Sequence, residues 1–510
     1  MKPSTLVRLS LAGNRTDRLR TVLTAGSAAL AALALLAAAT VASIRGGEWI
    51  DDPDGMRVMG PGADYSNALL AEAGLRPGVI FMLVMLALPV LALAGQCIRL
   101  GAPARDRRLA ALRLGGATPG QAVLIAGAET AAAALLGSIA GFAVFLGLRE
   151  LLDFRNGQGQ LVLPVDVLPN PVLIVVALLL VPLLAGGIGV LLMRRVVITP
   201  LGVVRRNRED GPGPGPGLLI AVGLPLFVLP KFLPSSVQLP DWAPLAFMGV
   251  GVLLVMLGVV LGTGWISYTS GRLLRRYGRG AATLLAGGRL MTDPWNGSRT
   301  LAALLGAVVV GAGTLGYWAQ LATEFRAAEQ YNAMIDPNAT SSIGFASDNE
   351  FYFGALRLIM IAVILAMVVA AAGVLVAFVE GIVARRRAYA ALTATGVPRR
   401  TLRQVLLWHT FVPLVPAVLL ALVSGAALFR LVGTEVRHGG PREECIDPMA
   451  DYATCAKQTF VDPLLVVPIP IPLQQLLLLG GGALLAMLIV VGIGAMVLRS
   501  STDLEELRVG

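Results

Sequence analysis

Residues of the kinds that carry out chemistry in proteins are scarce in this chain of 510 residues. It has two histidines, His409 and His438, and neither lies at the spacing from a nucleophile or a second ligand that a catalytic set or a metal centre needs. Its lysines are Lys2, Lys231 and Lys457, and none follows the glycine-rich run of a GxxxxGK phosphate loop. We therefore predict no catalytic residue, no metal site and no cofactor on this chain, and we expect any nucleotide chemistry to reside on another polypeptide.

Three cysteines are too few for a disulfide framework. Cys445 and Cys455 nonetheless lie ten residues apart in the polar stretch before the last apolar segment, which the charge pattern below assigns to the oxidising side of a membrane. We predict a loop-closing disulfide between them. Metal binding is the weaker alternative because His438 is the only nearby imidazole, and we interpret Cys97 as a small buried packing residue.

Glu129 and His409 are ionisable residues inside long apolar stretches, and they lie 280 residues apart, at equivalent places of the duplication described below. Ionisable groups are costly inside a bilayer and are often functional there. As a pair they would bind a cationic substrate or gate the space between two halves of the protein. The alternative is that both lie near enough to the inner membrane surface to be hydrated.

The composition excludes a soluble globular domain. Hydrophobic residues make up 56% of the chain and charged residues 14%, with a mean hydropathy of +0.76, whereas soluble domains have about 25% charged residues. The 59 glycines suit closely packed transmembrane helices. We therefore predict an all-α polytopic membrane protein.

Ten apolar stretches qualify as membrane spans, given that a helix needs about 20 residues to cross the bilayer core. They are residues 21–44, 79–98, 122–148, 172–193, 218–233, 245–266, 300–320, 352–379, 405–429 and 473–498. The fifth is the weakest, because it is short and contains Pro225 and Pro230, so a re-entrant or interfacial segment is the alternative. The first is longer than the apolar part of a signal peptide, and we expect it to be retained.

The net charge of +10 is distributed unevenly along this topology. With the N-terminus in the cytoplasm, most of the 41 Lys and Arg residues fall on inner segments and most of the 31 acidic residues on outer ones. This agrees with the positive-inside rule. We predict a bacterial cytoplasmic membrane protein with both termini in the cytoplasm.

One basic pattern occurs twice. Residues 104–116 read ARDRRLAALRLGG and residues 384–396 read ARRRAYAALTATG, so both fit A-R-x-R-x-x-A-A-L-x-x-x-G without a gap. Each copy follows an apolar span on the predicted inner side and leads into another. We predict a first four-helix unit at 1–208, a Gly/Pro linker with an inserted helix pair at 209–279, and a second four-helix unit at 280–510, related as a parallel repeat.

We predict that these two loops bind a partner. The alternative, in which the arginines only anchor the chain to anionic lipid, leaves the repeated apolar AALxxxG unexplained. The predicted partner-binding residues are Arg105, Arg107, Arg108, Leu109, Leu112, Arg113, Gly116 and Ala117 in the first copy and Arg385, Arg387, Leu392, Gly396, Val397 and Pro398 in the second.

At these loops the chain resembles the FtsX-like permease family of ABC transporters, which includes the MacB, lipoprotein-releasing and bacitracin-resistance types. Its members carry a loop of the form R-x-x-E-x-x-x-L-R-x-x-G-A-x-x-x-Q between their second and third helices. The matching positions are Arg105, Leu112, Arg113, Gly116, Ala117 and Gln121 in the first copy and Arg385, Leu392 and Gly396 in the second. The acidic residue of the pattern is absent, replaced by Arg108 and Ala388.

The resemblance implies that each loop is a coupling helix seated in a groove of a cytoplasmic ATPase subunit, so that two ATPase subunits would bind per chain. ATP and Mg²⁺ would then be bound by those partners. Members of the MacB and bacitracin-resistance types carry a large extracytoplasmic domain, whereas the corresponding segments here, 45–78 and 321–351, are long enough only for a small cap.

The expected function is a permease that exports or extracts a hydrophobic or amphipathic compound, such as an antimicrobial peptide, a drug or a lipid. The alternative is a regulatory membrane protein that signals to a sensor kinase or a cell-wall enzyme without transport. We expect membrane lipid, but no nucleic acid, among its partners.

Overall fold

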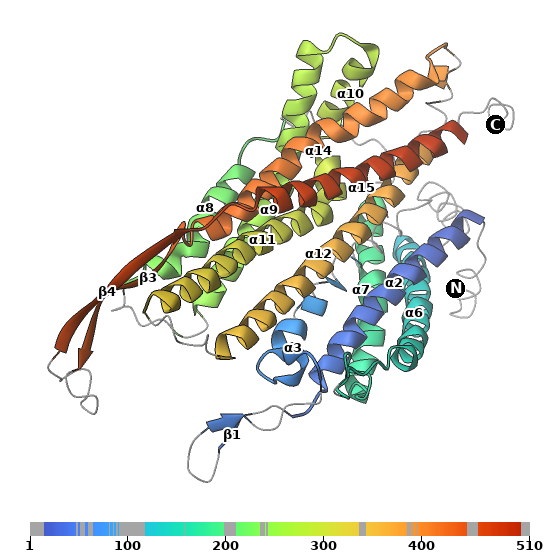
Figure 1. The fold of residues 1–510 in the computed structure, drawn as a ribbon. Coiled ribbons are helices and arrows are strands. Elements are labelled where there is room, and N and C mark those ends of the chain that lie inside the picture. Colours follow the sequence, from blue (N-terminus) through green and yellow to red (C-terminus); the bar gives the residue numbers. More distant parts are fainter. Residues whose placement is uncertain are drawn as a thin grey trace.

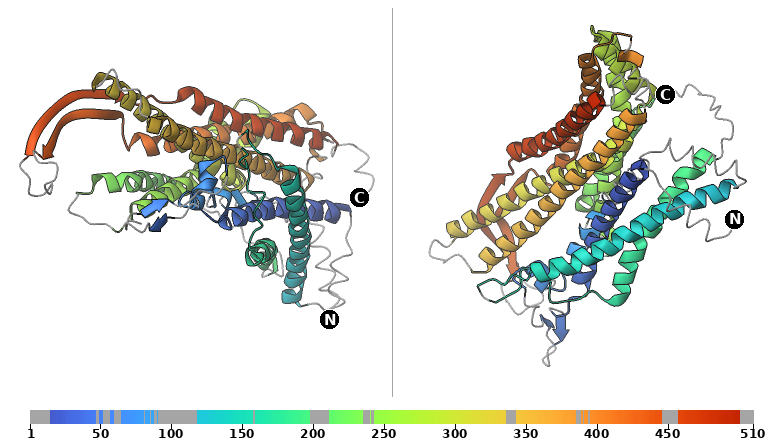
Figure 2. Two further views of the ribbon diagram at one scale, coloured as in Figure 1. Left: turned by 60° about the horizontal axis from the view of Figure 1, so that its bottom comes forward. Right: turned by 90° about the vertical axis from the view of Figure 1, so that its right-hand side faces the viewer.

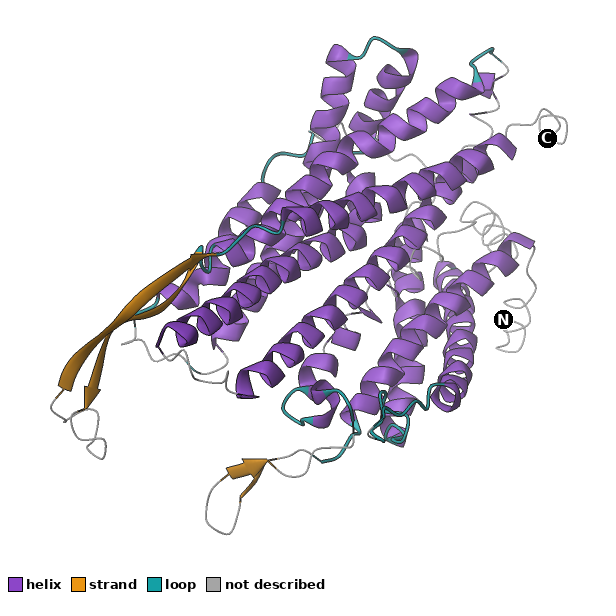
Figure 3. Ribbon diagram, viewed as in Figure 1, coloured by secondary structure: helices purple, strands orange, loops and turns teal. Residues whose placement is uncertain are grey.

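The structure is a computed structural model and describes residues 15–46, 49–51, 57–59, 65–80, 82–84, 86–87, 90, 118–157, 159–197, 211–234, 240, 243–335, 343–384, 389, 391–393, 395–445 and 457–500. Within these ranges it is a bundle of long helices, and the strands are confined to two hairpins (Figure 3). We call the end of the bundle that the charge pattern assigns to the cytoplasm the inner end, and the opposite end the outer end.

The helices and strands follow one another along the chain with short connections. The helices are α2 (Arg15–Ala42), α3 (Ala68–Ala71), α6 (Pro119–Leu151), α7 (Pro171–Val197), α8 (Pro216–Phe232), α9 (Ala243–Tyr277), α10 (Ala281–Thr292), α11 (Trp295–Ile335), α12 (Ile343–Ala384), α14 (Arg399–Arg430) and α15 (Leu473–Ser500). The strands are β1 (Trp49–Asp51), β2 (Arg57–Met59), β3 (Glu435–Cys445) and β4 (Lys457–Pro468).

Eight of the described helices are long and apolar enough to cross a membrane. They contain the predicted first, third, fourth, sixth, seventh, eighth, ninth and tenth spans, so the prediction of a multi-pass helical membrane protein is confirmed. The second predicted span, 79–98, lies largely outside the described residues. Ten crossings therefore stay a prediction.

The fifth predicted span forms α8, a helix of 17 residues. It runs antiparallel to α9 with the backbones in close approach, because a side chain at Gly223 would meet the Gly251 carbonyl and one at Gly258 would meet the Pro216 carbonyl. At its outer end, Lys231 donates a hydrogen bond from Nζ to the carbonyl of Val432, just after α14. Helix α8 is therefore fixed both to α9 and to the outer end of α14.

Two groups of helices repeat one packing arrangement. Helices α2, α6 and α7 pack on one another, and α11, α14 and α15 do the same in the same chain order, with α12 against α11 and α15 (Figure 2). In the first group, Gly137 and Gly141 of α6 lie against the backbone of α2. Ala417 and Ala421, 280 residues later on α14, are fully buried in the core around α11.

The outer end of the first group carries a small cap, as expected for residues 45–78. Its core is formed by Val41, Ile44, Tyr65, Leu70 and Leu161, drawn from both loops of that end. Arg76, which is 5% exposed, donates hydrogen bonds to three carbonyls, those of Leu70, Ile44 and Ala71. Burial and a hydrogen bond to Asp166 raise the pKa of Tyr65, so its hydroxyl remains a donor at neutral pH.

The outer end of the second group differs from the expected small cap. The helices themselves continue: α11 has 41 residues and α12 has 42, so each is about 60 Å long, roughly twice the bilayer core. Beside them β3 and β4 form a long antiparallel hairpin that extends away from the bundle (Figure 1). The all-α expectation missed this hairpin, although the β-branched and aromatic residues of Lys457–Pro468 favour a strand.

The close contact between α2 and α6 gives a direct test of the packing. A Cβ at Gly137 would lie 2.1 Å from the carbonyl oxygen of Ala25, whereas one at Gly147 of the same helix would meet nothing within 4 Å. We expect Gly137→Val to lower the free energy of unfolding by about 1–3 kcal/mol through overpacking. Gly147→Val is the matched control. Thermal unfolding in detergent measures both, and equal midpoints for the two variants would contradict the α2–α6 contact.

Candidate functional site

The predicted partner-binding loops are described in part. Of the second copy, the structure describes Leu392, Gly396, Val397 and Pro398, whereas Arg385 and Arg387 lie outside the described residues. The whole of the first copy also lies outside them: Arg105, Arg107, Arg108, Leu109, Leu112, Arg113, Gly116 and Ala117. The geometry of the loop is therefore taken from the second copy.

The short helical turn of the second loop ends in a Schellman motif. Gly396 has φ +91°, and its N–H donates to the carbonyl of Thr393 at 3.0 Å. The N–H of Val397 donates to the carbonyl of Leu392 at 3.1 Å. These are the two hydrogen bonds that define this helix ending, which needs a residue with positive φ four positions after the first acceptor. The Leu-x-x-x-Gly spacing of the repeated pattern therefore has a structural cause.

A buried tyrosine holds this turn against the bundle. Tyr389 is 7% exposed and packs with Ile382 of α12, Leu402 and Leu406 of α14, and Leu498 of α15. Arg289 of α10 donates a hydrogen bond of 2.9 Å from Nη1 to the Tyr389 hydroxyl, and its guanidinium lies 5.9 Å from the ring centroid. The loop thus contacts the inner ends of three membrane helices, and a force applied to it reaches all three.

One apolar side chain of the turn remains available on its surface. Leu392 is 38% exposed, and Ala391 beside it is exposed as well. The turn therefore has a buried side, formed around Tyr389, and an exposed apolar side at Leu392. This is the arrangement that a short helix needs if it is to bind a groove on another protein while remaining attached to its own bundle.

Both loops pass into the next membrane helix through an equivalent cap. In the first, Thr118 and Gln121 form a capping box at the start of α6: the Thr118 N–H donates to Gln121 Oε1 at 3.0 Å, and the Gln121 N–H donates to Thr118 Oγ1 at 3.3 Å. In the second, Pro398 is the cap residue of α14, 280 positions after Thr118. Gln121, which matches the family pattern, thus has a structural role at the helix start.

The other predicted site residues are placed individually. Glu129 on α6 and His409 on α14 are both half-buried, and each has an interaction partner, so neither is an unpaired charge in the membrane. Their roles in substrate binding or gating stay predictions. Cys445 is the last residue of β3, whereas Cys455 lies outside the described residues, so the disulfide also stays a prediction. Among the described residues, no group of three or more His, Cys, Asp or Glu could hold a metal ion.

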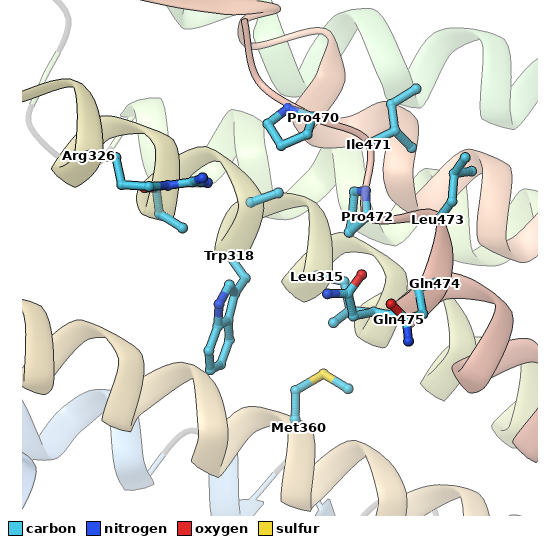
Figure 4. Close-up of a pocket in the computed structure, with 12 residues that line it drawn as sticks. Leu315, Trp318, Arg326, Met360, Pro470, Ile471, Pro472, Leu473, Gln474 and Gln475 are labelled. Carbon is cyan, nitrogen blue, oxygen red and sulfur yellow. The ribbon is translucent and has the colours of Figure 1, made fainter. Parts of the chain in front are cut away.

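A cavity at the outer end was not found from the sequence. It has a volume of about 670 Å³, within the usual range for ligand pockets, and lies between α11, α12, α15 and the segment that leads into α15 (Figure 4). We call it the outer cavity. Its lining residues are Leu315, Trp318, Ala319, Ala322, Arg326, Met360, Pro470, Ile471, Pro472, Leu473, Gln474 and Gln475. The proline-rich stretch before the last span was the one sequence signal at this place.

Comparison with known proteins gives one family. The model of the FtsX-like permease C-terminal region matches residues 79–201 and 360–502, which together make up just over half of the chain. One matched stretch lies in each predicted unit, and each includes one copy of the repeated loop. No curated protein and no solved structure matches the chain.

The Schellman motif predicts the effect of one methyl group at position 396. We expect Gly396→Ala to destabilise the turn by about 1–2 kcal/mol, because the positive φ places Cβ in steric conflict with the backbone. Amide hydrogen exchange at Val397 should then be faster by roughly 5- to 30-fold.

The matched control is Gly381→Ala on α12, where a Cβ has open space and the backbone lacks the positive φ of position 396. This variant should leave exchange at Val397 unchanged. If Gly396→Ala exchanges at the wild-type rate too, the described helix ending does not hold the loop.

Proposed function

The chain belongs to the FtsX-like permease family, and on that premise we propose that it is the membrane-embedded permease of an ATP-driven transporter that exports or extracts a hydrophobic or amphipathic compound. Members of this family are membrane components of ABC transporters, act without catalytic activity of their own, and work with cytoplasmic ABC ATPases. The chain is accordingly a multi-pass membrane protein.

The observation that carries the proposal is the seating of the loop around Tyr389. A coupling element has to be rigid on the side of the permease and exposed on the side of the ATPase. Tyr389 and Val397 pack on the inner ends of the membrane helices, and Leu392 remains on the surface. We propose that the first loop does the same with Leu112, so that one chain binds two ATPase subunits, which hold the ATP and Mg²⁺.

The outer cavity supports the choice of an amphipathic substrate. Its lining is mostly apolar and includes Trp318 and Met360, while Arg326 and two glutamines lie around it. A compound with an apolar part and a polar head would satisfy both kinds of lining. Glu129 and His409 are proposed to act at the inner side of the same path.

The alternative function, signalling without transport, is favoured by a different observation. The hairpin β3–β4 extends beyond the bundle and packs against the outer part of α11, where the rings of Tyr331 and His438 stack with centroids 5.9 Å apart. Motion of α11 would therefore reach a partner outside the membrane through this hairpin. Such a partner would be a sensor kinase or a cell-wall enzyme.

The coupling role is tested by charge on the two loops. We expect the double variant Leu112→Glu, Leu392→Glu to lose most ATPase binding, because each substitution buries a carboxylate in an apolar contact. Since Leu392 is 38% exposed, the fold should survive. Co-purification with each candidate ATPase subunit and stimulation of ATP hydrolysis are measured, and we expect binding to weaken at least about tenfold.

Leu464→Glu is the matched control. This leucine is 62% exposed on β4, at the opposite end of the bundle, so the same change should not affect ATPase binding. The proposal fails if the double variant still binds and stimulates an ATPase, or if no ATPase associates with the wild-type chain. Movement of a labelled compound in reconstituted vesicles then distinguishes transport from signalling.

A further inference from the structure

We propose that the outer cavity binds an anionic amphiphile of the outer leaflet, with its acidic headgroup at Arg326 and its apolar part against Trp318 and Met360. Its use as a transport site rests on the proposed function, whereas the binding itself does not. The inference depends on where the cavity lies in the bilayer, on the charge of its lining, and on its mechanical connection to the inner loop.

Aromatic residues place the cavity at the headgroup level of the outer leaflet. Trp318 lies 5.1 Å, centroid to centroid, from Phe353, and Phe325 lies 6.0 Å from both Phe353 and Tyr352. Trp and Tyr collect where the apolar bilayer core meets the headgroups. Figure 4 shows the Trp318 indole pointing toward α12 and Met360 pointing back toward it, so the wall closest to this aromatic cluster is apolar.

The cavity opens toward lipid rather than toward water alone. Ile471 and Leu473, on the side formed by the start of α15, are 53% and 65% exposed although they are large and apolar. On α12, Ile361 and Ile364 are exposed in the same way. In a membrane helix such residues face acyl chains. A lipid-like molecule could therefore enter sideways, without leaving the bilayer.

The charge of the lining selects the headgroup. Arg326 is the ionisable residue among those that line the cavity, and Gln474 and Gln475 supply neutral amides. The Arg326 Nε–H donates to the carbonyl of Ala322 at 2.8 Å, which fixes the side chain along α11 and, among the described residues, leaves both Nη groups without an acceptor. Guanidinium groups bind phosphate and carboxylate through paired N–H donors. An acidic headgroup complements this lining, whereas a cationic one would be repelled.

One wall of the cavity is attached to the helix that begins at the coupling loop. Arg430, at the outer end of α14, donates a hydrogen bond of 2.5 Å from Nη1 to the carbonyl of Ile469. The Ile469 N–H donates in turn to the carbonyl of Thr434 at 2.9 Å. Because Pro468, Pro470 and Pro472 stiffen this segment, a displacement of α14 would move the wall as a unit. Occupancy of the cavity and the position of the inner loop should therefore be coupled.

Trp318 reports directly on the occupant. The purified chain is placed in vesicles of phosphatidylcholine containing a small fraction of brominated lipid, either phosphatidylglycerol or phosphatidylcholine, and the fluorescence lost in Trp318→Phe isolates the signal of this indole. We expect brominated phosphatidylglycerol to quench it with an apparent affinity about fivefold higher than brominated phosphatidylcholine, the effect of one cation near the membrane surface.

Variants of the cation test the cause of this preference. Arg326→Gln should abolish the preference, and Arg326→Lys should retain most of it. The matched control is Arg357→Gln, an exposed arginine on α12 that does not line the cavity, which should leave the preference unchanged. Equal quenching by the two lipids in wild type, or a preference that survives Arg326→Gln, overturns the proposal.

A soluble headgroup distinguishes a lipid from a free anion. Glycerol 1-phosphate, added at millimolar concentration, should not relieve the quenching by brominated phosphatidylglycerol, and relief would overturn the assignment to an amphiphile. All these measurements use the chain without ATPase or ATP. A lost lipid preference with intact ATPase binding therefore refutes only the cavity proposal, and a lipid preference without any ATPase refutes only the proposed coupling.

Discussion

The turn before α14 is held in place by one buried ring and one hydrogen bond. Tyr389 fills a space between the inner ends of α12, α14 and α15, and Arg289 bonds to its hydroxyl at 2.9 Å from a fourth helix, α10. A polar group buried at a helix junction is stabilising only when it has a partner. The arrangement therefore fixes the loop relative to three membrane helices, and the geometry at the outer end of the second unit follows from that fixed start.

Small residues make this transmission possible within the membrane. Lipid chains are as apolar as leucine, so helices associate through close packing rather than through hydrophobic exclusion. A side chain at Gly425 of α14 would meet the Val309 carbonyl of α11 at 2.5 Å. Helices packed this closely move together, because their interface has no free volume to absorb a displacement.

Much of this fold follows from the sequence, and the reason is that the bilayer constrains it strongly. A backbone in lipid must satisfy its own hydrogen bonds, so an apolar stretch of sufficient length predicts a helix and its approximate ends. The repeated Leu-x-x-x-Gly identified the loop, and Gly396 does carry the positive φ of a helix ending. The exposure of Leu392 and the burial of Tyr389 depend on helix α10 and could not be read from that pattern.

The parts that the sequence did not reveal lie outside the bilayer or between helices. Hairpin β3–β4 has Gly439 and Gly440 at an irregularity between its strands, both with positive φ, so its alternation is interrupted and reads as a loop. The outer cavity is formed by residues that come from three helices and a proline-rich segment. No single stretch contains such a site, and Arg326 alone looks like one more exposed arginine at a helix end.

The two halves of the molecule resemble each other at the inner end and differ at the outer end. Both loops pass into their next helix through a cap at equivalent positions, Thr118 and Pro398. At the outer end, the first half forms the small cap around Tyr65, whereas the second half extends α11 and α12 and carries the hairpin and the cavity. Among the described residues, the features able to act on another molecule at the outer end thus belong to the second half. Duplicated loops would then supply force to both halves, and the first half would serve as the fixed part against which the second moves.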